Sequence, residues 1–304
     1  MNYRIFQRLS KHLSHRLFIL PLLSLLLAAM AGCADSDKSS TSDYTQLIVF
    51  GASLSDNGNA DNLVPGLHPG APYYPGRASN GLLWIDEFAA QLGNSVKPFI
   101  KGGSNYAVGG ARTCGITGTS VHPLDMCEQV SVYLAQVNGK ADANALYVVD
   151  TTAVGNNIFG VVNNGLSHSA ITDDAPADIR RLMDKLYIAG ARKFLVNNLP
   201  NVGDTPKGRN STASSTITSL SNQFGAALEN ELNSFRSSRI GTSIKIADFK
   251  STVSSAVGFS NTTDACYVEG AGVCANPDSY VYWDNLHPTA AMGRSLAQAA
   301  LNAL

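Results

Sequence analysis

The sequence predicts an α/β protein in which helices cover both faces of a parallel β-sheet. Short apolar runs alternate along the chain with longer segments of helical periodicity, which is typical of parallel strands joined by helical crossovers. Hydrophobic residues make up 44% of the 304 residues and charged residues only 15%, enough apolar material for a large core. In such sheets ligands bind beyond the carboxyl ends of the strands, and the segments of chemical interest follow strand candidates.

Five short apolar runs are predicted to be strands. The first of them ends at Gly51, and the run at 105–108 ends at a pair of glycines, as strands that lead into turns commonly do. Their ranges are 46–50, 105–108, 146–149, 193–196 and 244–246.

Five longer segments are predicted to be helices. In one of them Ile179, Leu182 and Leu186 recur at helical spacing, which indicates a face packed on the core. The predicted ranges are 82–92, 128–137, 175–190, 216–235 and 289–304.

The first 32 residues are predicted to be an export signal. A basic stretch from Arg4 to Arg16 precedes an apolar run over 17–31, which has the length of a signal peptide and is short for a membrane span. The run ends in Met30-Ala31-Gly32-Cys33, which resembles a bacterial lipobox except that Met30 stands where leucine is usual. We therefore expect Cys33 to be lipidated and to anchor the protein in the cell envelope; the alternative is an ordinary cleaved signal and secretion.

The exported part is expected to consist of a polar tether over 33–43 and one domain over 44–304, because no second linker and no internal repeat follows. Removing the first 32 residues leaves 18 basic against 23 acidic residues. This acidic balance excludes an electrostatic footprint for nucleic acid. No protein partner is indicated.

Four more cysteines predict two disulfides, since an even count is typical of exported proteins. Three pairings are possible, and the simplest is the local one, Cys114–Cys127 with Cys266–Cys274. Metal binding is the competing role, but the sequence contains no CxxC or HExxH motif, so we expect no metal site.

Ser53 follows the first predicted strand, at the start of a helix. A serine at this place exposes its hydroxyl at the sheet edge, and its amide lies where a developing oxyanion is favoured. The alternative is that Ser53 only caps the helix. The α/β-hydrolase signature GxSxG is not satisfied, because Ser55 occupies the position of its second glycine.

Asp284 and His287 offer a base near the C-terminus. They are three positions apart, so the carboxylate can hold one ring nitrogen and leave the other free to take a proton from serine. The alternative is an aspartate that caps the terminal helix and a histidine in its first turn.

Five segments taken together resemble the GDSL lipases and esterases, also known as SGNH hydrolases. The segments occur in the order of the family's blocks and span 46–304: FGASLSDNGN at 50–59, SNG with Trp84, NYAVGGA at 105–111, NLPNVG with Pro206, and DNLHPT at 284–289. Each block alone is weak, but five in order are a specific signal.

The resemblance implies a three-layer α/β/α, flavodoxin-like SGNH hydrolase fold and hydrolysis of carboxylic esters, small or lipid, without a metal or cofactor. It implies that Ser53 is the nucleophile, that His287 is the general base and that Asp284 orients it. The oxyanion hole would consist of the backbone N–H groups of Ser53 and Gly110 and an asparagine side chain.

Two departures from the family pattern stand out. Ala52 replaces the aspartate of GDSL, which is not a triad member. The third block is irregular: an ungapped alignment makes Asn156 the oxyanion donor, whereas a shift by one makes it Asn157. We take Asn156; the alternative is that both form local turns.

The predicted reaction is therefore a two-step acyl transfer to water through an acyl-enzyme. An acyltransferase or a carbohydrate deacetylase on the same fold is the alternative among enzymes, since substrate choice resides in loops. A non-catalytic surface lipoprotein is the alternative from another class, motivated by Ala52 and the irregular third block. Tyr73, Tyr74 and Trp84 could line a substrate pocket, although such aromatics more often belong to the core or rim.

Overall fold

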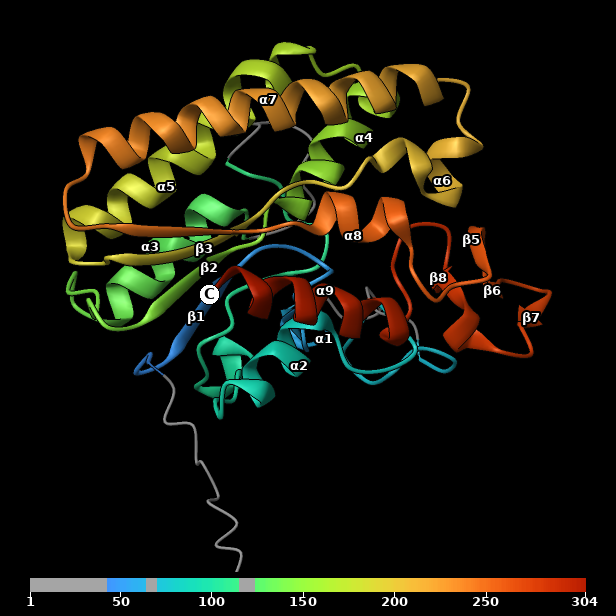
Figure 1. The fold of residues 1–304 in the computed structure, drawn as a ribbon, viewed down its shortest axis with the longest axis horizontal. Coiled ribbons are helices and arrows are strands. Elements are labelled where there is room, and N and C mark those ends of the chain that lie inside the picture. The colour runs from blue at the N-terminus through green and yellow to red at the C-terminus, as the bar shows by residue number, and fades with distance from the viewer. Residues whose placement is uncertain (1–42, 64–69, 115–123) are drawn as a thin grey trace, which may run out of the picture. The chain divides into compact units, whose positions relative to one another are not determined.

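A computed structural model describes residues 43–63, 70–114 and 124–304 (Figure 1). The predicted signal peptide at 1–32, the lipidation site Cys33 and nearly all of the predicted tether lie outside the described residues. Within the described ranges, no helix combines the length and the apolar character needed to span a bilayer.

Four parallel strands form the central sheet. They are β1 (Leu47–Phe50), β2 (Leu146–Val149), β3 (Lys193–Asn197) and β4 (Ser243–Ala247), side by side in this order. Every residue of β1 and β2 is buried, which explains why both strands are continuously apolar rather than alternating.

The segment predicted as a strand at 105–108 forms only isolated bridges, from Asn105 to Val49 and to Pro98, so that prediction is wrong in extent. Asn105 bridges to Val49 on the free edge of β1, but the chain soon leaves the sheet at Gly110, whose φ of 79° favours glycine. If the bridge at Asn105 is counted as a strand, it is the second strand in the sequence and lies on the outer side of β1. The five strands, numbered along the chain, then have the spatial order 2-1-3-4-5, which is the flavodoxin-like order.

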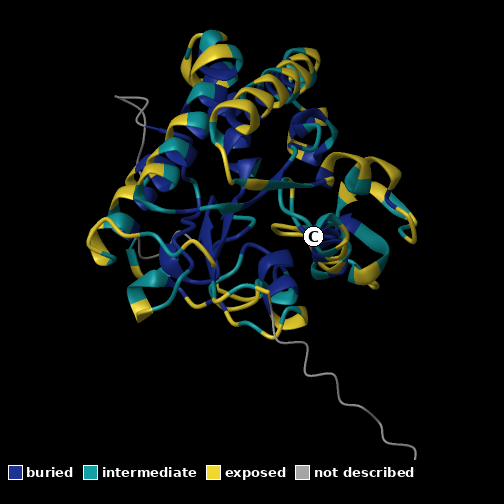
Figure 2. Ribbon diagram, turned by 60° about the vertical axis from the view of Figure 1, so that its left-hand side comes forward, coloured by how far each residue is buried: buried dark blue, intermediate teal, exposed yellow. Residues whose placement is uncertain are grey.

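Helices cover both faces of this sheet, which confirms the predicted three-layer arrangement (Figure 1). Ile48 and Phe50 pack into one core cluster, whereas Leu47 and Val49 pack into the other. The first face is covered by α3 (Met126–Gln136), α4 (Val154–Asn164), α5 (Ala175–Ala189) and α7 (Ser214–Ser238), and the second by α2 (Trp84–Gln91), α8 (Phe249–Ser255) and α9 (Ala290–Ala303). Figure 2 shows a buried interior between helices whose outer sides are exposed; β1 and β2 are buried throughout, whereas most of β4 is only half-buried.

Several short elements beyond the sheet escaped prediction. Strands β5 (Asn261–Ala265) and β8 (Tyr280–Tyr282) pair in parallel, and β6 (Tyr267–Val268) and β7 (Gly272–Val273) form a hairpin. The remaining helices are α1 (Asn59–Leu63), α6 (Pro206–Arg209), the short 3-10 turns at Phe99–Lys101, Thr151–Ala153, Val202–Asp204 and Pro277–Ser279, and a π-helical turn at Ala170–Asp174.

The structure forms both disulfides in the local pairing. Cys114 is bonded to Cys127 with a Cα–Cα distance of 5.0 Å, and Cys266 to Cys274 with 4.8 Å. The second disulfide ties the ends of the β6–β7 hairpin together, next to the segment that carries Asp284 and His287.

Candidate active site

Ser53 lies just beyond the carboxyl end of β1, on a turn fixed from two sides. Gln129 on α3 accepts a hydrogen bond from the Gly51 amide at 2.9 Å and donates one to the Gly51 carbonyl at 2.8 Å. A Cβ at Gly51 would lie 2.7 Å from that of Asp150, so only glycine fits where the strand ends. The chain then folds back, because the amides of Ser55 and Asp56 both donate to the Ala52 carbonyl.

The structure brings Ser53, His287 and Asp284 into one line of hydrogen bonds. Ser53 Oγ lies 2.9 Å from His287 Nε2 across 234 positions of sequence, and His287 Nδ1 lies 2.8 Å from Asp284 Oδ2. The backbone N–H groups of Leu286 and His287 donate to the other carboxylate oxygen, Oδ1, at 2.8 and 2.6 Å. The three-residue spacing thus closes a tight turn that aims the ring at the serine.

The surroundings of Asp284 keep its carboxylate charged. Burial would raise the pKa of Asp284, but the His287 ring and the backbone N–H groups of His287 and Leu286 together hold the pKa well below its usual range. An ionised carboxylate on Nδ1 leaves Nε2 facing Ser53 Oγ as a proton acceptor, which is the arrangement of a general base.

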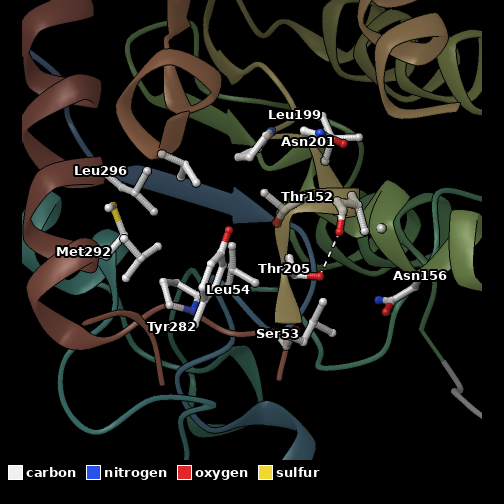
Figure 3. Close-up of a pocket in the computed structure, with 17 residues that line it drawn as sticks. Ser53, Leu54, Thr152, Asn156, Leu199, Asn201, Thr205, Tyr282, Met292 and Leu296 are labelled. Carbon is white, nitrogen blue, oxygen red and sulfur yellow. Dashed lines mark hydrogen bonds between the residues drawn. The ribbon is translucent and has the colours of Figure 1, made fainter. Parts of the chain in front are cut away.

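The groups predicted to form the oxyanion hole belong to Ser53, Gly110 and Asn156. Among the residues that the structure describes, the N–H groups of Ser53 and Gly110 donate to no protein acceptor. Asn156 Nδ2 donates to the Ala111 carbonyl at 2.7 Å, so its side chain is held against the Gly110 segment, and it lines the same pocket as Ser53 (Figure 3).

Asn157, the other asparagine of the irregular block, has a different environment. It is fully buried. Its side-chain oxygen accepts a hydrogen bond from the Thr113 backbone N–H at 3.3 Å, and its side-chain amide donates one to Thr113 Oγ1 at 3.1 Å. These contacts tie α4 to the chain after Gly110, so Asn157 supports the segment rather than facing the pocket.

Asp56 and Asp150 hold the loops around Ser53; the place of Asp56 at a helix start could be inferred from sequence, but its contact with the second loop and the contacts of Asp150 could not. Asp56 accepts from the N–H groups that begin α1 and, through Oδ2, from the Gly109 amide at 2.7 Å. Asp150 is fully buried and accepts from Ser55 Oγ at 2.6 Å and Thr152 Oγ1 at 2.6 Å, and burial raises its pKa. An aspartate directly before the helix start was the available signal for Asp56; Asp150 could be read only as the end of a strand.

An apolar pocket lies beside Ser53 (Figure 3). Figure 3 shows Met292 and Leu296 of α9 on one side of Tyr282 and Asn156 on the other. The apolar lining is formed by Leu54, Leu199, Pro200, Val202, Val253, Val281, Tyr282, Leu286, Pro288, Met292 and Leu296, and the polar side chains by Ser53, Thr152, Asn156, Asn201 and Thr205. Because this lining comes from many separate segments, no single sequence pattern could predict the pocket.

The aromatic residues considered as pocket lining, Tyr73, Tyr74 and Trp84, differ in their surroundings. Trp84 is buried in the core and donates from Nε1 to Ser55 Oγ at 3.1 Å. Tyr74 is 43% exposed. Tyr73 donates from its hydroxyl to Asp284 Oδ2 at 2.9 Å, a contact with the site that its sequence context did not indicate.

Metal ligands do not gather in the part of the chain that the structure describes. No group of three or more His, Cys, Asp or Glu side chains in it could hold an ion.

Comparisons with known proteins find similarity over most of the chain. Residues 47–300 match the family model of GDSL-like lipases/acylhydrolases. The chain is 27% identical to a GDSL esterase/lipase from Arabidopsis thaliana over 315 residues, covering 84% of this chain and 86% of the relative, and 28% identical to an acetylesterase from Thermothelomyces thermophilus over 302 residues, covering 92% and 95%.

Other similarities are more partial. Lipase 1 of Photorhabdus luminescens is 33% identical over 165 residues, which cover 54% of this chain but only 23% of the lipase. The crystal structure of an acetylxylan esterase from Geobacillus stearothermophilus superposes with a TM-score of 0.48 at 12% identity, covering 84% of this chain and 92% of that chain.

Proposed function

The chain belongs to the GDSL-like lipase/acylhydrolase family and is a serine ester hydrolase, and on this basis we propose that Ser53, His287 and Asp284 form its catalytic triad. The observation that carries the proposal is the continuous set of contacts from Ser53 Oγ through the His287 ring to the Asp284 carboxylate.

The proposed reaction has two steps. Ser53 Oγ attacks the ester carbonyl while His287 Nε2 takes its proton, and His287 then gives that proton to the departing alcohol, which leaves an acyl-enzyme. Water attacks the acyl-enzyme next, with His287 again as base, and the acid departs from a regenerated Ser53. Asp284 keeps the ring oriented and stabilises its charged form.

The oxyanion of each step is proposed to bind the N–H groups of Ser53 and Gly110 and the side-chain amide of Asn156. The two backbone donors have no protein acceptor among the described residues, and the contact of Asn156 with the Ala111 carbonyl holds its amide beside Gly110. Removing one such donor typically costs about 3 kcal/mol of transition-state stabilisation.

The pocket supports esters with an apolar acyl chain as substrates. Each methylene group that enters an apolar pocket contributes about 0.8 kcal/mol, so kcat/KM should rise with chain length until the pocket is full. Polar lining is limited to a few side chains near Ser53 and the loop after β3, which leaves few partners for a sugar hydroxyl there.

Acetyl esters are the second candidate, favoured by the similarity to an acetylesterase over most of both chains. A chain-length series of p-nitrophenyl acetate, butyrate and octanoate separates the two, with Ser53→Ala as the inactive control. We expect the longer esters to be hydrolysed faster than the acetate. A maximum at acetate would favour the acetylesterase, and equal rates for wild type and Ser53→Ala would refute Ser53 as nucleophile.

Hydrolysis and transfer differ only in the acceptor, so an acyltransferase uses the same triad. Adding an alcohol acceptor to the assay and measuring the new ester distinguishes them: we expect the free acid as the main product. A non-catalytic binding protein is not supported, because the chain belongs to a family of hydrolases.

We also propose that the protein is exported. Two disulfides are typical of proteins that fold in an oxidising compartment, which supports removal of 1–32 as a signal peptide. We propose that Cys33 carries a lipid anchor. Mass spectrometry of the mature N-terminus should find the lipid mass on Cys33, and a free thiol there would contradict the anchor.

A further inference from the structure

We propose that Tyr73 is a positioning residue that sets the basicity of His287 through a shared oxygen atom of Asp284. The proposal rests on the triad proposed above. It assigns to Tyr73 a role in the pH dependence of the reaction, and no contact with the substrate.

The geometry places two donors on one carboxylate oxygen. Tyr73 Oη lies 2.9 Å from Asp284 Oδ2, and His287 Nδ1 lies 2.8 Å from the same atom. The other oxygen, Oδ1, is occupied by the two backbone N–H groups of the turn. Tyr73 is 211 positions from Asp284, so this contact is not a by-product of local turn geometry.

Aromatic packing fixes the direction of the Tyr73 hydroxyl. The Tyr73 ring meets Tyr267 edge-on at 5.5 Å and Trp283 edge-on at 6.0 Å, and those two rings stack on each other at 5.6 Å. Trp283 directly precedes Asp284, and the Cys266–Cys274 disulfide closes the hairpin that carries Tyr267. A phenylalanine at position 73 would keep these ring contacts and lose only the hydroxyl.

The charged and titratable groups around this pair come from several segments. Glu269 and Tyr267 of the hairpin face Tyr73, and Lys207 and His287 face Asp284. Burial, followed by the Asp284 charge, raises the pKa of Tyr73 well above its usual range, which favours a protonated hydroxyl that donates to Asp284. Burial lowers the pKa of Lys207 while Asp284 opposes that shift.

The direction of the effect follows from competition for the shared oxygen. A carboxylate that already accepts a hydrogen bond from a phenol attracts the imidazolium less strongly than a carboxylate without it. Loss of the hydroxyl therefore strengthens the hold on protonated His287, raises the pKa of that ring and delays formation of the neutral base. The shift should be roughly half to one pH unit, the size expected for the loss of one hydrogen bond to a charged partner.

The test is the pH dependence of kcat/KM for p-nitrophenyl butyrate in wild type, Tyr73→Phe and Tyr74→Phe. Tyr74 is the matched control, because it is adjacent and exposed and its ring faces Arg77 instead of Asp284. We expect the acidic limb of Tyr73→Phe to move to higher pH by this amount and that of Tyr74→Phe to coincide with wild type. An unmoved limb in Tyr73→Phe, or equal shifts in both variants, would overturn the proposal.

A second measurement reports on His287 without requiring turnover. The ring of His287 is titrated by NMR in the Ser53→Ala background, with and without Tyr73→Phe. A higher pKa of His287 in the double variant supports the role of Tyr73, and identical titrations refute it. Because this readout does not depend on Ser53 acting as nucleophile, failure of the triad proposal and failure of the Tyr73 proposal are distinguishable.

Discussion

Single side chains define the chemistry proposed for this site, and Asp284 makes four hydrogen-bond contacts there. Replacing it with asparagine preserves the size of the side chain but presents an amide to His287 Nδ1, which favours the wrong tautomer. We expect Asp284→Asn to lower kcat by roughly 10³- to 10⁴-fold. Steady-state kinetics check this value, and near-UV circular dichroism ensures that the variant is folded; a loss below tenfold would contradict the role of Asp284 as orienter.

Asp284 also links stability to pH. Its pKa is lower in the folded than in the unfolded chain, so the stabilisation is fully present above the unfolded value of about 4 and is lost as the pH falls below it. We expect the free energy of unfolding of wild type to fall in this acid range more steeply than that of Asp284→Asn. Urea titrations of both proteins at a series of acid pH values measure the difference, and parallel curves would contradict it.

The two adjacent asparagines offer a separation of catalysis from stability. Asn156→Ala removes the proposed oxyanion donor and should lower kcat roughly 10²- to 10³-fold with little effect on folding. Asn157→Ala leaves the buried Thr113 backbone N–H without its acceptor, so it should destabilise the fold by about 1–3 kcal/mol while the folded fraction keeps its activity. Kinetics and denaturant unfolding of both variants decide, and the reverse pattern would transfer the donor role to Asn157.

At the scale of elements, the candidate site is formed by three chain segments that meet at one edge of the sheet. The turn after β1 supplies Ser53, the start of α4 after β2 supplies Asn156, and the turn before α9 supplies His287. The chain passes from β1 to the bridge at Asn105 on one side of β1, and then to β2 on its other side. The strand order therefore reverses between β1 and β2, and such folds bind ligands at this topological switch point.

Helix α9 contributes one wall of the pocket, and this wall should limit acyl length. Leu296 is buried and faces the pocket, whereas Gln298 is exposed on the same helix. We expect Leu296→Trp to reduce hydrolysis of p-nitrophenyl octanoate far more than that of the acetate, because the larger ring fills space intended for the chain. Gln298→Trp is the control and should leave the chain-length profile unchanged; a profile unaffected by Leu296→Trp would show that the acyl chain binds elsewhere.

Helix α4 shows why some elements were not predicted from the sequence. Its residues include Gly155, Asn156, Asn157 and Gly160, which are poor helix formers, so propensity argued against a helix in this segment. The structure shows that burial of Val154, Ile158 and Val161 in the core stabilises the helix instead. Tertiary packing of these apolar residues, which recur at helical spacing, outweighed intrinsic preference here.

At the scale of the whole molecule, the sheet was predictable because buried parallel strands are continuous apolar runs. The same rule failed at 105–108, where Tyr106, Ala107 and Val108 are buried but pair with β1 over too short a stretch to form a strand. The small pairs β5–β8 and β6–β7 also escaped. The side chains of β5, β6 and β7 are mostly exposed, and β8 is too short to show a hydrophobic pattern.

The site was predictable to the extent that it lies in short motifs. Ser53, Asp284 and His287 each stand in a recognisable block, and the structure places them in hydrogen-bond contact. Tyr73 and the apolar pocket could not be predicted in this way, because their relation to Asp284 and Ser53 exists only after distant segments have packed together.

The central claim is that Ser53 is a nucleophile activated by His287, and labelling with a fluorophosphonate tests it most directly. The reagent forms a stable bond with an activated serine, and mass spectrometry of the digested protein locates the added mass. We predict stoichiometric labelling of Ser53 in the wild-type protein and a strong loss of labelling in His287→Ala. Label on a different serine, or equal labelling of Ser53 with and without His287, would contradict the account.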